Sequence, residues 1–220
     1  MTQPTPTPAS PRERKKALLR AELLEAAHEL VKEEGYEGLT IRKLAQRVGY
    51  APMSVYSYFA DKHAILLALA EDAFETLAQR MERDAPAEPL AALRKIMEEY
   101  AVFALENPNE YRTIFMTRDP AGLRGKDVTE IGKLESGNPA LRILLKRVQA
   151  CIDAGIFKGD VHAISTLLWS CGHGAISLQL AFPFYPFGEP SKFLAASMEV
   201  ALAGLMAQKI EALVPPEERC

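Results

Sequence analysis

Apolar residues recur every three or four positions along most of this chain, which is the spacing of amphipathic helices. The segments with this period are about 12–34, 40–48, 52–59, 62–83, 89–106, 110–117, 139–154, 160–182 and 191–213. The Pro/Thr-rich residues 1–11 predict a disordered or extended tail. Residues 118–138 hold four glycines and mixed charges, and they predict a mobile or partly helical connection. No strand pattern stands out, so we expect an all-α fold of about nine helices.

The stretch from Gly38 to Leu67 is the most informative. Thr40 is suited to cap a helix, because its hydroxyl can accept an orphan backbone N–H. Gly49 can end that helix in a left-handed conformation, and Pro52 suits the first turn of the next helix. The inner faces of the two helices are formed by Ile41, Leu44, Ala45, Val48, Val55 and Phe59. Two short helices joined by a glycine turn predict the helix-turn-helix that enters a DNA major groove.

The same region closely resembles the TetR family of bacterial transcriptional regulators. The matching positions, over roughly residues 17 to 67, are Gly35-Tyr36, Thr40-Ile41-Arg42, Gly49, Tyr56, Tyr58-Phe59, Lys62 and Leu66-Leu67. The second helix departs from the family, since it reads Tyr50-Ala51-Pro52-Met53-Ser54-Val55-Tyr56 where relatives often carry Val-Ser-x-Gly-Thr-Leu-Tyr. The resemblance implies the fold and leaves the operator sequence open.

The resemblance also implies which residues face DNA. Arg42 matches a position from which some relatives contact guanine, although a phosphate contact or plain solvation fits it equally. The positions that usually bind phosphates in the family are Thr40, Ser54, Tyr56, Tyr58 and Lys62. Pro52 and Met53 have no hydrogen-bonding side chain, so they would read DNA shape or a thymine methyl group. Ser57 and Tyr50 are the remaining base-reading candidates, and Lys43 and Arg47 are either phosphate contacts or solvated.

The charge distribution is compatible with a DNA partner. The whole chain has a net charge of −3, yet residues 1–63 hold ten Lys and Arg against eight Asp and Glu. A local basic surface is what phosphate binding requires. The basic run between Arg12 and Arg20 is either a solvated helix face or an arm that reaches phosphates or the minor groove.

Cysteine usage and the N-terminus indicate a cytoplasmic protein. The three cysteines, Cys151, Cys171 and Cys220, have no paired spacing, which suits a reducing compartment. The N-terminal segment has no apolar run after its charges, so we do not expect a secretory signal. Residues 161–188 contain no Asp, Glu, Lys or Arg, but their many polar side chains favour burial in a soluble interface over a membrane span.

The last two helices, about 160–182 and 191–213, are the strongest indication of a dimer. Between Phe193 and Met206 only Ser197 and Glu199 are polar. A helix that is apolar around most of its circumference needs a partner on more than one face. The family resemblance implies a four-helix bundle with a second copy, which also fits a palindromic operator. The alternative is that both helices form the internal core of a monomer.

The C-terminal part also indicates a small-molecule site. Relatives in the TetR family bind an effector among their central helices, and Trp169 with His173-Gly174 resembles the Trp…His-Gly signature of one subset. The candidate pocket residues are Tyr100, Phe103, Tyr111, Phe115, Trp169 and His173. His173 is either a polar anchor for the ligand or a structural hydrogen-bonding group. Gly172 and Gly174 each cost about 1 kcal/mol in a helix, so we expect close helix packing to compensate.

No motif favours an enzyme, because nucleotide, nucleophile-elbow and zinc-protease patterns are missing from the sequence. We expect no cofactor and no metal site. The predicted organisation is a tail over 1–11, a DNA-binding domain over 12–63, and a ligand-binding and dimerisation domain over 64–215. The predicted function is a DNA-binding regulator, most simply a repressor released by a small apolar or amphipathic effector. The alternative is a helical small-molecule-binding or enzymatic protein that does not use its head for specific DNA binding.

Overall fold

The computed structural model describes residues 10–116 and 138–213. These residues form nine α-helices and one pair of two-residue strands, which confirms the all-α prediction. The helices are α1 (Pro11–Gly38), α2 (Ile41–Arg47), α3 (Pro52–Tyr56), α4 (Lys62–Glu82), α5 (Pro89–Glu106), α6 (Pro108–Phe115), α8 (Pro139–Asp153), α9 (Val161–Ala181) and α10 (Pro190–Ala207). The predicted connection over 118–138 lies almost wholly outside the described residues.

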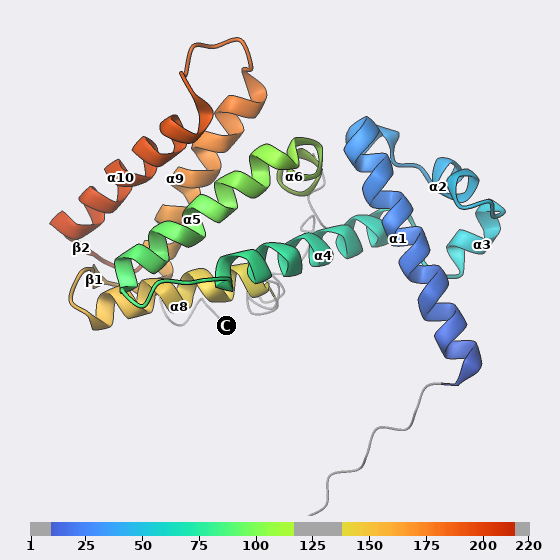
Figure 1. Ribbon diagram of the computed structural model, residues 1–220, viewed down its shortest axis with the longest axis horizontal. Helices are drawn as coiled ribbons and strands as arrows, with labels where there is room; N and C mark the ends of the chain where they lie inside the picture. The colour runs from blue at the N-terminus through green and yellow to red at the C-terminus, as the bar shows by residue number, and fades with distance from the viewer. Residues whose placement is uncertain (1–9, 117–137, 214–220) are drawn as a thin grey trace, which may run out of the picture.

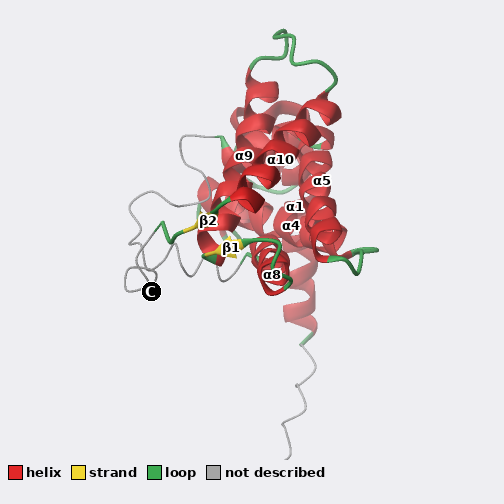
Figure 2. Cartoon of the chain, turned by 90° about the vertical axis from the view of Figure 1, so that its left-hand side faces the viewer, coloured by secondary structure: helices red, strands yellow, loops and turns green. Residues whose placement is uncertain are grey.

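The helices gather at two ends of an elongated molecule (Figure 1). The first three helices form a head, and α4 leads from the head into a body that contains α5, α8, α9 and α10. Turned by 90°, the body shows α9, α10 and α5 beside one another, with a loop that projects past the ends of α9 and α10 (Figure 2).

Local signals set the ends of the head helices as expected. The Thr40 hydroxyl accepts the Lys43 N–H at 3.1 Å and so caps α2, and Gly49 adopts a φ of +72° in the turn before α3. At the start of α1, Ser10 and Glu13 bond reciprocally in a capping box. Gly35, with a φ of +69°, interrupts the regular helix where the sequence predicted a stop.

Two predicted helix ends were wrong. The helix expected over 52–59 ends at Tyr56, and the helix expected over 191–213 ends at Ala207. After Ala207 the chain becomes extended, because β2 (Lys209–Ile210) pairs in parallel with β1 (Lys158–Gly159). Two-residue strands are too short to show an alternating pattern, so no pattern along the chain predicted them.

Each end of the molecule has its own apolar core, and α4 contributes to both. The first turns of α4 place Ile65 and Leu69 in the head cluster with residues of α1–α3. The later turns place Leu77 and Met81 in the body cluster with α5, α8, α9 and α10. Because one rigid helix belongs to both cores, a shift of α4 in the body must also move the head.

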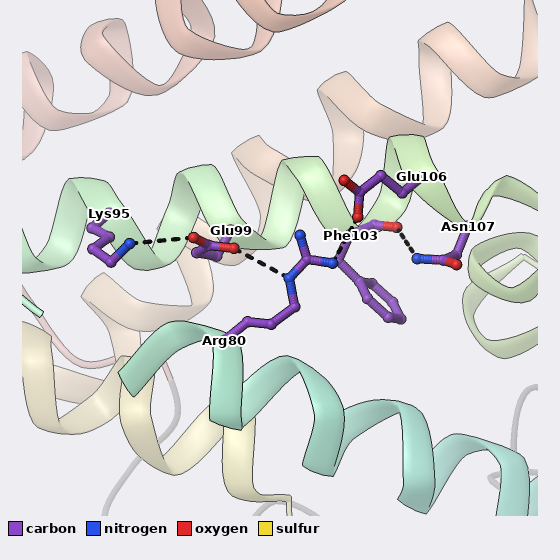
Figure 3. Close-up of polar contacts among 6 residues, drawn as sticks. All are labelled: Arg80, Lys95, Glu99, Phe103, Glu106 and Asn107. Carbon is purple, nitrogen blue, oxygen red and sulfur yellow. Dashed lines mark hydrogen bonds and ion pairs between the residues drawn. The ribbon is translucent and has the colours of Figure 1, made fainter. Parts of the chain in front are cut away.

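Ion pairs reinforce the packing of α4 on α5 (Figure 3). The Arg80 guanidinium donates to Glu99 at 3.2 Å and to Glu106 at 2.7 Å. Lys95 donates to the other oxygen of Glu99 at 3.2 Å. The guanidinium therefore joins two turns of α5 to the C-terminal end of α4.

A histidine lies where α1, α4 and α6 meet. His28 Nδ1 is 2.8 Å from Glu110 Oε1 of α6, and its Nε2 is 3.0 Å from Asp72 Oδ2 of α4. Burial acts to lower the pKa of His28, but the hydrogen bonds and charges of the two carboxylates outweigh it, so the pKa is raised. The imidazolium form donates from Nδ1 to Glu110 and places its positive charge beside Asp72. His28 in this form therefore connects the head to the body.

Candidate DNA-binding head and effector site

The two helices of the helix-turn-helix present several predicted DNA-facing residues to solvent. Met53 is 77% exposed and Tyr56 is 50% exposed, and Arg42, Pro52 and Ser57 are exposed as well. Arg42 makes no ion pair within the described residues. The Thr40 hydroxyl uses a lone pair to cap α2, so its proton remains available to donate. Ser54 is half-buried at the start of α3.

The other two cations of α2 have partners inside the protein. Lys43 forms an ion pair with Glu34 of α1, and an Arg47 nitrogen lies 2.5 Å from Glu33 Oε2. Lys43 and Arg47 therefore hold α2 against α1, a structural role that the two sequence readings, phosphate contact and plain solvation, did not include.

Two predicted phosphate-binding residues, Lys62 and Tyr58, contact other residues of the head. Lys62 donates to the Tyr36 carbonyl oxygen at 2.7 Å, and its ammonium lies 3.6 Å from the centre of the Tyr36 ring. Partial burial lowers the pKa of Lys62, although the nearby charge of Glu37 opposes this shift. Tyr58 was expected to point outward, but it is half-buried and packs against the head core.

Four of the six predicted pocket residues form a hydrogen-bonded cluster between α5, α6 and α9. The Tyr100 and Tyr111 hydroxyl oxygens are 2.8 Å apart. His173 Nδ1 lies 2.5 Å from the Tyr111 hydroxyl and 3.4 Å from that of Tyr100. The Trp169 indole N–H donates to the Tyr100 oxygen at 3.3 Å. We call these four residues the polar aromatic cluster.

Phe115 joins the cluster through its ring, whereas Phe103 does not. The Phe115 ring centre is 4.8 Å from that of Tyr111 and 5.6 Å from that of His173. Phe103 is buried in the body core, and Figure 3 shows its ring on the side of α5 that faces α4. The sequence missed Ser177, whose hydroxyl lies 3.3 Å from His173 Nε2. Its spacing of four residues from His173 on α9 was the signal that could have found it.

The cluster is electrically neutral near neutral pH. Burial raises the pKa of Tyr100 to about 12 and also raises that of Tyr111. Burial lowers the pKa of His173 and so favours the neutral imidazole. The site therefore offers neutral hydrogen-bond donors and acceptors among aromatic rings, which suits an uncharged polar group on an otherwise apolar molecule.

Close packing accounts for one of the two glycines beside His173. A Cβ at Gly172 would lie 3.2 Å from Met97 Cε and 3.5 Å from Met198 Sδ, so this glycine brings α9 close to α5 and α10. A Cβ at Gly174 would meet nothing within 4 Å in the described chain. Packing inside one protomer therefore leaves Gly174 unexplained.

An apolar surface covers the outer faces of α9, α10 and the loop between them. Val200 is 75% exposed and Phe184 is 99% exposed. Other exposed apolar side chains on the same elements are Trp169, Leu178, Phe182, Tyr185 and Met206. Several large exposed apolar side chains on neighbouring helices mark a site of protein association.

Two family models match the chain. The model of bacterial regulatory proteins, tetR family, matches residues 23–69. The model of the tetracyclin repressor-like C-terminal domain matches residues 93–205. The chain belongs to the TetR family.

Individual relatives agree with this TetR assignment. The chain is 29% identical to the class A tetracycline repressor of transposon 1721 from Escherichia coli, over 66% of the chain and 60% of that protein. It is 29% identical to the transcriptional repressor AcnR of Corynebacterium glutamicum, over 72% of the chain and 80% of AcnR. The fold is similar to that of FadR from Bacillus subtilis, solved with stearoyl-CoA, with a TM-score of 0.65 and 20% identity over 84% and 98% of the two chains.

The described residues of this TetR-family chain add two further findings. No helix within 10–116 or 138–213 is long and apolar enough to cross a membrane. The same residues contain no group of three His, Cys, Asp or Glu side chains that could hold a metal ion.

Proposed function

We propose that this TetR-family chain is a homodimeric repressor that binds a palindromic operator and is released by a small effector. The observation that carries the proposal is the exposed helix-turn-helix on a head that shares α4 with the body. Arg42 reads a guanine or a phosphate, and Thr40, Ser54, Tyr56, Tyr58 and Lys62 fix the register on the backbone. Pro52, Met53 and Ser57 face the base edges. Bacterial operators lie in the cytoplasm, and we propose this location on that ground.

The proposed dimer forms through the apolar faces of α9 and α10. These faces would place two copies side by side, and a two-fold dimer matches a palindromic operator. Residues 12–63 would then carry DNA recognition and residues 64–215 effector binding and dimerisation.

The proposed effector is a small apolar or amphipathic molecule that carries one neutral polar group. Tyr100, Tyr111, Trp169 and His173 would hydrogen-bond that group, and Phe115 would contact the apolar part. Because the rings contact one another in this structure, an effector must displace some of them. Phe103, which lies in the core, is no longer part of the proposed site.

The helix α6 offers a direct route from the effector to the head. Tyr111 of α6 belongs to the polar aromatic cluster, and the preceding residue, Glu110, bonds His28 of α1. A movement of Tyr111 would therefore strain the contact between Glu110 and His28. Effector binding would favour a conformation in which the two heads no longer match successive major grooves.

Selection of the purified chain on random duplex DNA tests this function. We expect one palindromic sequence to be enriched, and the Arg42→Ala, Tyr56→Phe double variant to lose it while the dimer stays intact. A folded wild-type chain that enriches no sequence, with and without candidate effectors, would contradict the proposal and favour a protein that does not use its head on DNA.

A further inference from the structure

The first turns of α1 carry basic side chains on one side of the helix. Arg12, Lys16 and Arg20 are spaced by four residues, so they form a row along the helix, and all three are exposed. Farther along, the same side becomes the apolar row that enters the head core at Leu23 and Ala27. The basic row therefore continues the side of α1 that faces the helix-turn-helix, beyond the end of the core.

Arg20 is the residue of this row that lies closest to the head core. Its guanidinium carbon lies 5.1 Å from the centre of the Phe59 ring, and Phe59 is buried just after α3. From Arg20 the helix reaches about 12 Å to Arg12, at about 1.5 Å per residue. Figure 1 shows these first turns projecting past α3, clear of the remainder of the head.

The row adds free positive charge beside the helix-turn-helix, where Arg42 has no ion pair in the described part of the chain but the neighbouring cations have partners. Lys43 and Arg47 are paired with glutamates of α1, and Lys62 is held by Tyr36. Within the described residues, Arg12 and Lys16 make no ion pair or side-chain hydrogen bond.

The carboxylate of Glu13, which lies in these turns, already accepts a hydrogen bond. Glu13 accepts the Ser10 backbone N–H at 2.7 Å in the capping box. Its carboxylate is therefore tied to the start of the helix, and it does not pair with Arg12 or Lys16.

We propose that Arg12 and Lys16 bind the backbone phosphates that flank each half-site of the operator. This inference rests on the proposed function, because it needs a DNA-bound head. Duplex DNA carries one negative charge per about 1.7 Å of its axis, so a row of this length faces several phosphates. Such contacts carry no base information, and they set affinity and register.

The chain offers a matched control for this proposal. Arg14 lies about 160° around the helix from Arg12, at about 100° per residue. The test variants are Arg12→Ala and the double variant Arg12→Ala, Lys16→Ala. The control is Arg14→Ala, which removes the same residue type and charge as Arg12→Ala from the same turn of the helix. All three positions are exposed, and alanine is the best helix former, so the variants keep the fold.

The test measures operator affinity of the full chain between about 50 and 200 mM salt, together with a hydroxyl-radical footprint. Each phosphate contact adds about 0.9 to the slope of log affinity against log salt. We expect Arg12→Ala to lower the slope by about 2 for a dimer and the double variant to lower it by about 3 to 4. Both should lose protection at the outermost backbone positions of the footprint. The control variant keeps the wild-type slope and footprint.

Two outcomes would overturn the inference in different ways. Equal slopes for Arg12→Ala and Arg14→Ala, with a wild-type chain that binds its operator, would reject the α1 contact and leave the proposed function standing. Failure of the folded wild-type chain to bind any duplex would remove the proposed function and this contact together.

Discussion

The junction of α1, α4 and α6 makes the head's attachment to the body depend on pH. His28 donates to Glu110, whose side chain is 17% exposed, and contacts Asp72, which is 57% exposed. A hydrogen bond to a charged group contributes about 1.5–3 kcal/mol, whereas an exposed ion pair contributes about 0–1 kcal/mol. The Glu110 contact should therefore account for most of the stabilisation.

We expect His28→Ala to lower the free energy of unfolding by about 2–3 kcal/mol at pH 6, because it leaves the Glu110 carboxylate buried without its partner. The raised pKa means that folded His28 binds its proton more tightly than unfolded histidine. This stabilisation is complete below the unfolded pKa of about 6.5 and is lost as the pH rises through the folded pKa. The difference between wild type and variant should thus shrink by pH 9.

Urea unfolding at pH 6 and pH 9, at one fixed protein concentration, measures both effects. Asp72→Asn is the internal comparison, and we expect it to cost less than about 1 kcal/mol because that carboxylate is largely solvated. A His28→Ala loss below about 0.5 kcal/mol at pH 6, or one of equal size at both pH values, would refute this account of the junction.

Three further predictions follow from single positions. Gly49→Ala forces a side chain into a left-handed turn at φ +72°, so we expect the free energy of unfolding in urea to fall by about 1–3 kcal/mol. An unchanged free energy of unfolding would mean that the turn relaxes. Gly159→Ala places a Cβ 1.9 Å from the Ile210 carbonyl oxygen, which accepts the Asp160 backbone N–H. We therefore expect faster hydrogen exchange at the Asp160 N–H, and unchanged protection would contradict the strand pairing. Tyr111→Phe removes the hydroxyl that bonds His173; we expect about 1 kcal/mol of lost stability and weaker effector-induced release from DNA, and wild-type release would exclude this hydroxyl from the effector site.

Much of the helical architecture was predictable because its signals are local. A cap such as Thr40 or a turn such as Gly49 acts on backbone groups within about four residues. The apolar period likewise reports which face of a helix is buried. These local signals are sufficient to specify the helix-turn-helix and the all-α class.

Which side chains remain free to act depends on how the helices pack against one another. In the sequence, Lys43 and Arg47 fit phosphate contacts and plain solvation equally, yet the crossing of α2 on α1 pairs them with glutamates. The polar aromatic cluster joins Tyr100 to His173, which is 73 positions away, and β2 ends the last helix by pairing with residues far back in the chain. Contacts of this kind depend on how helices pack, and no local propensity encodes that arrangement.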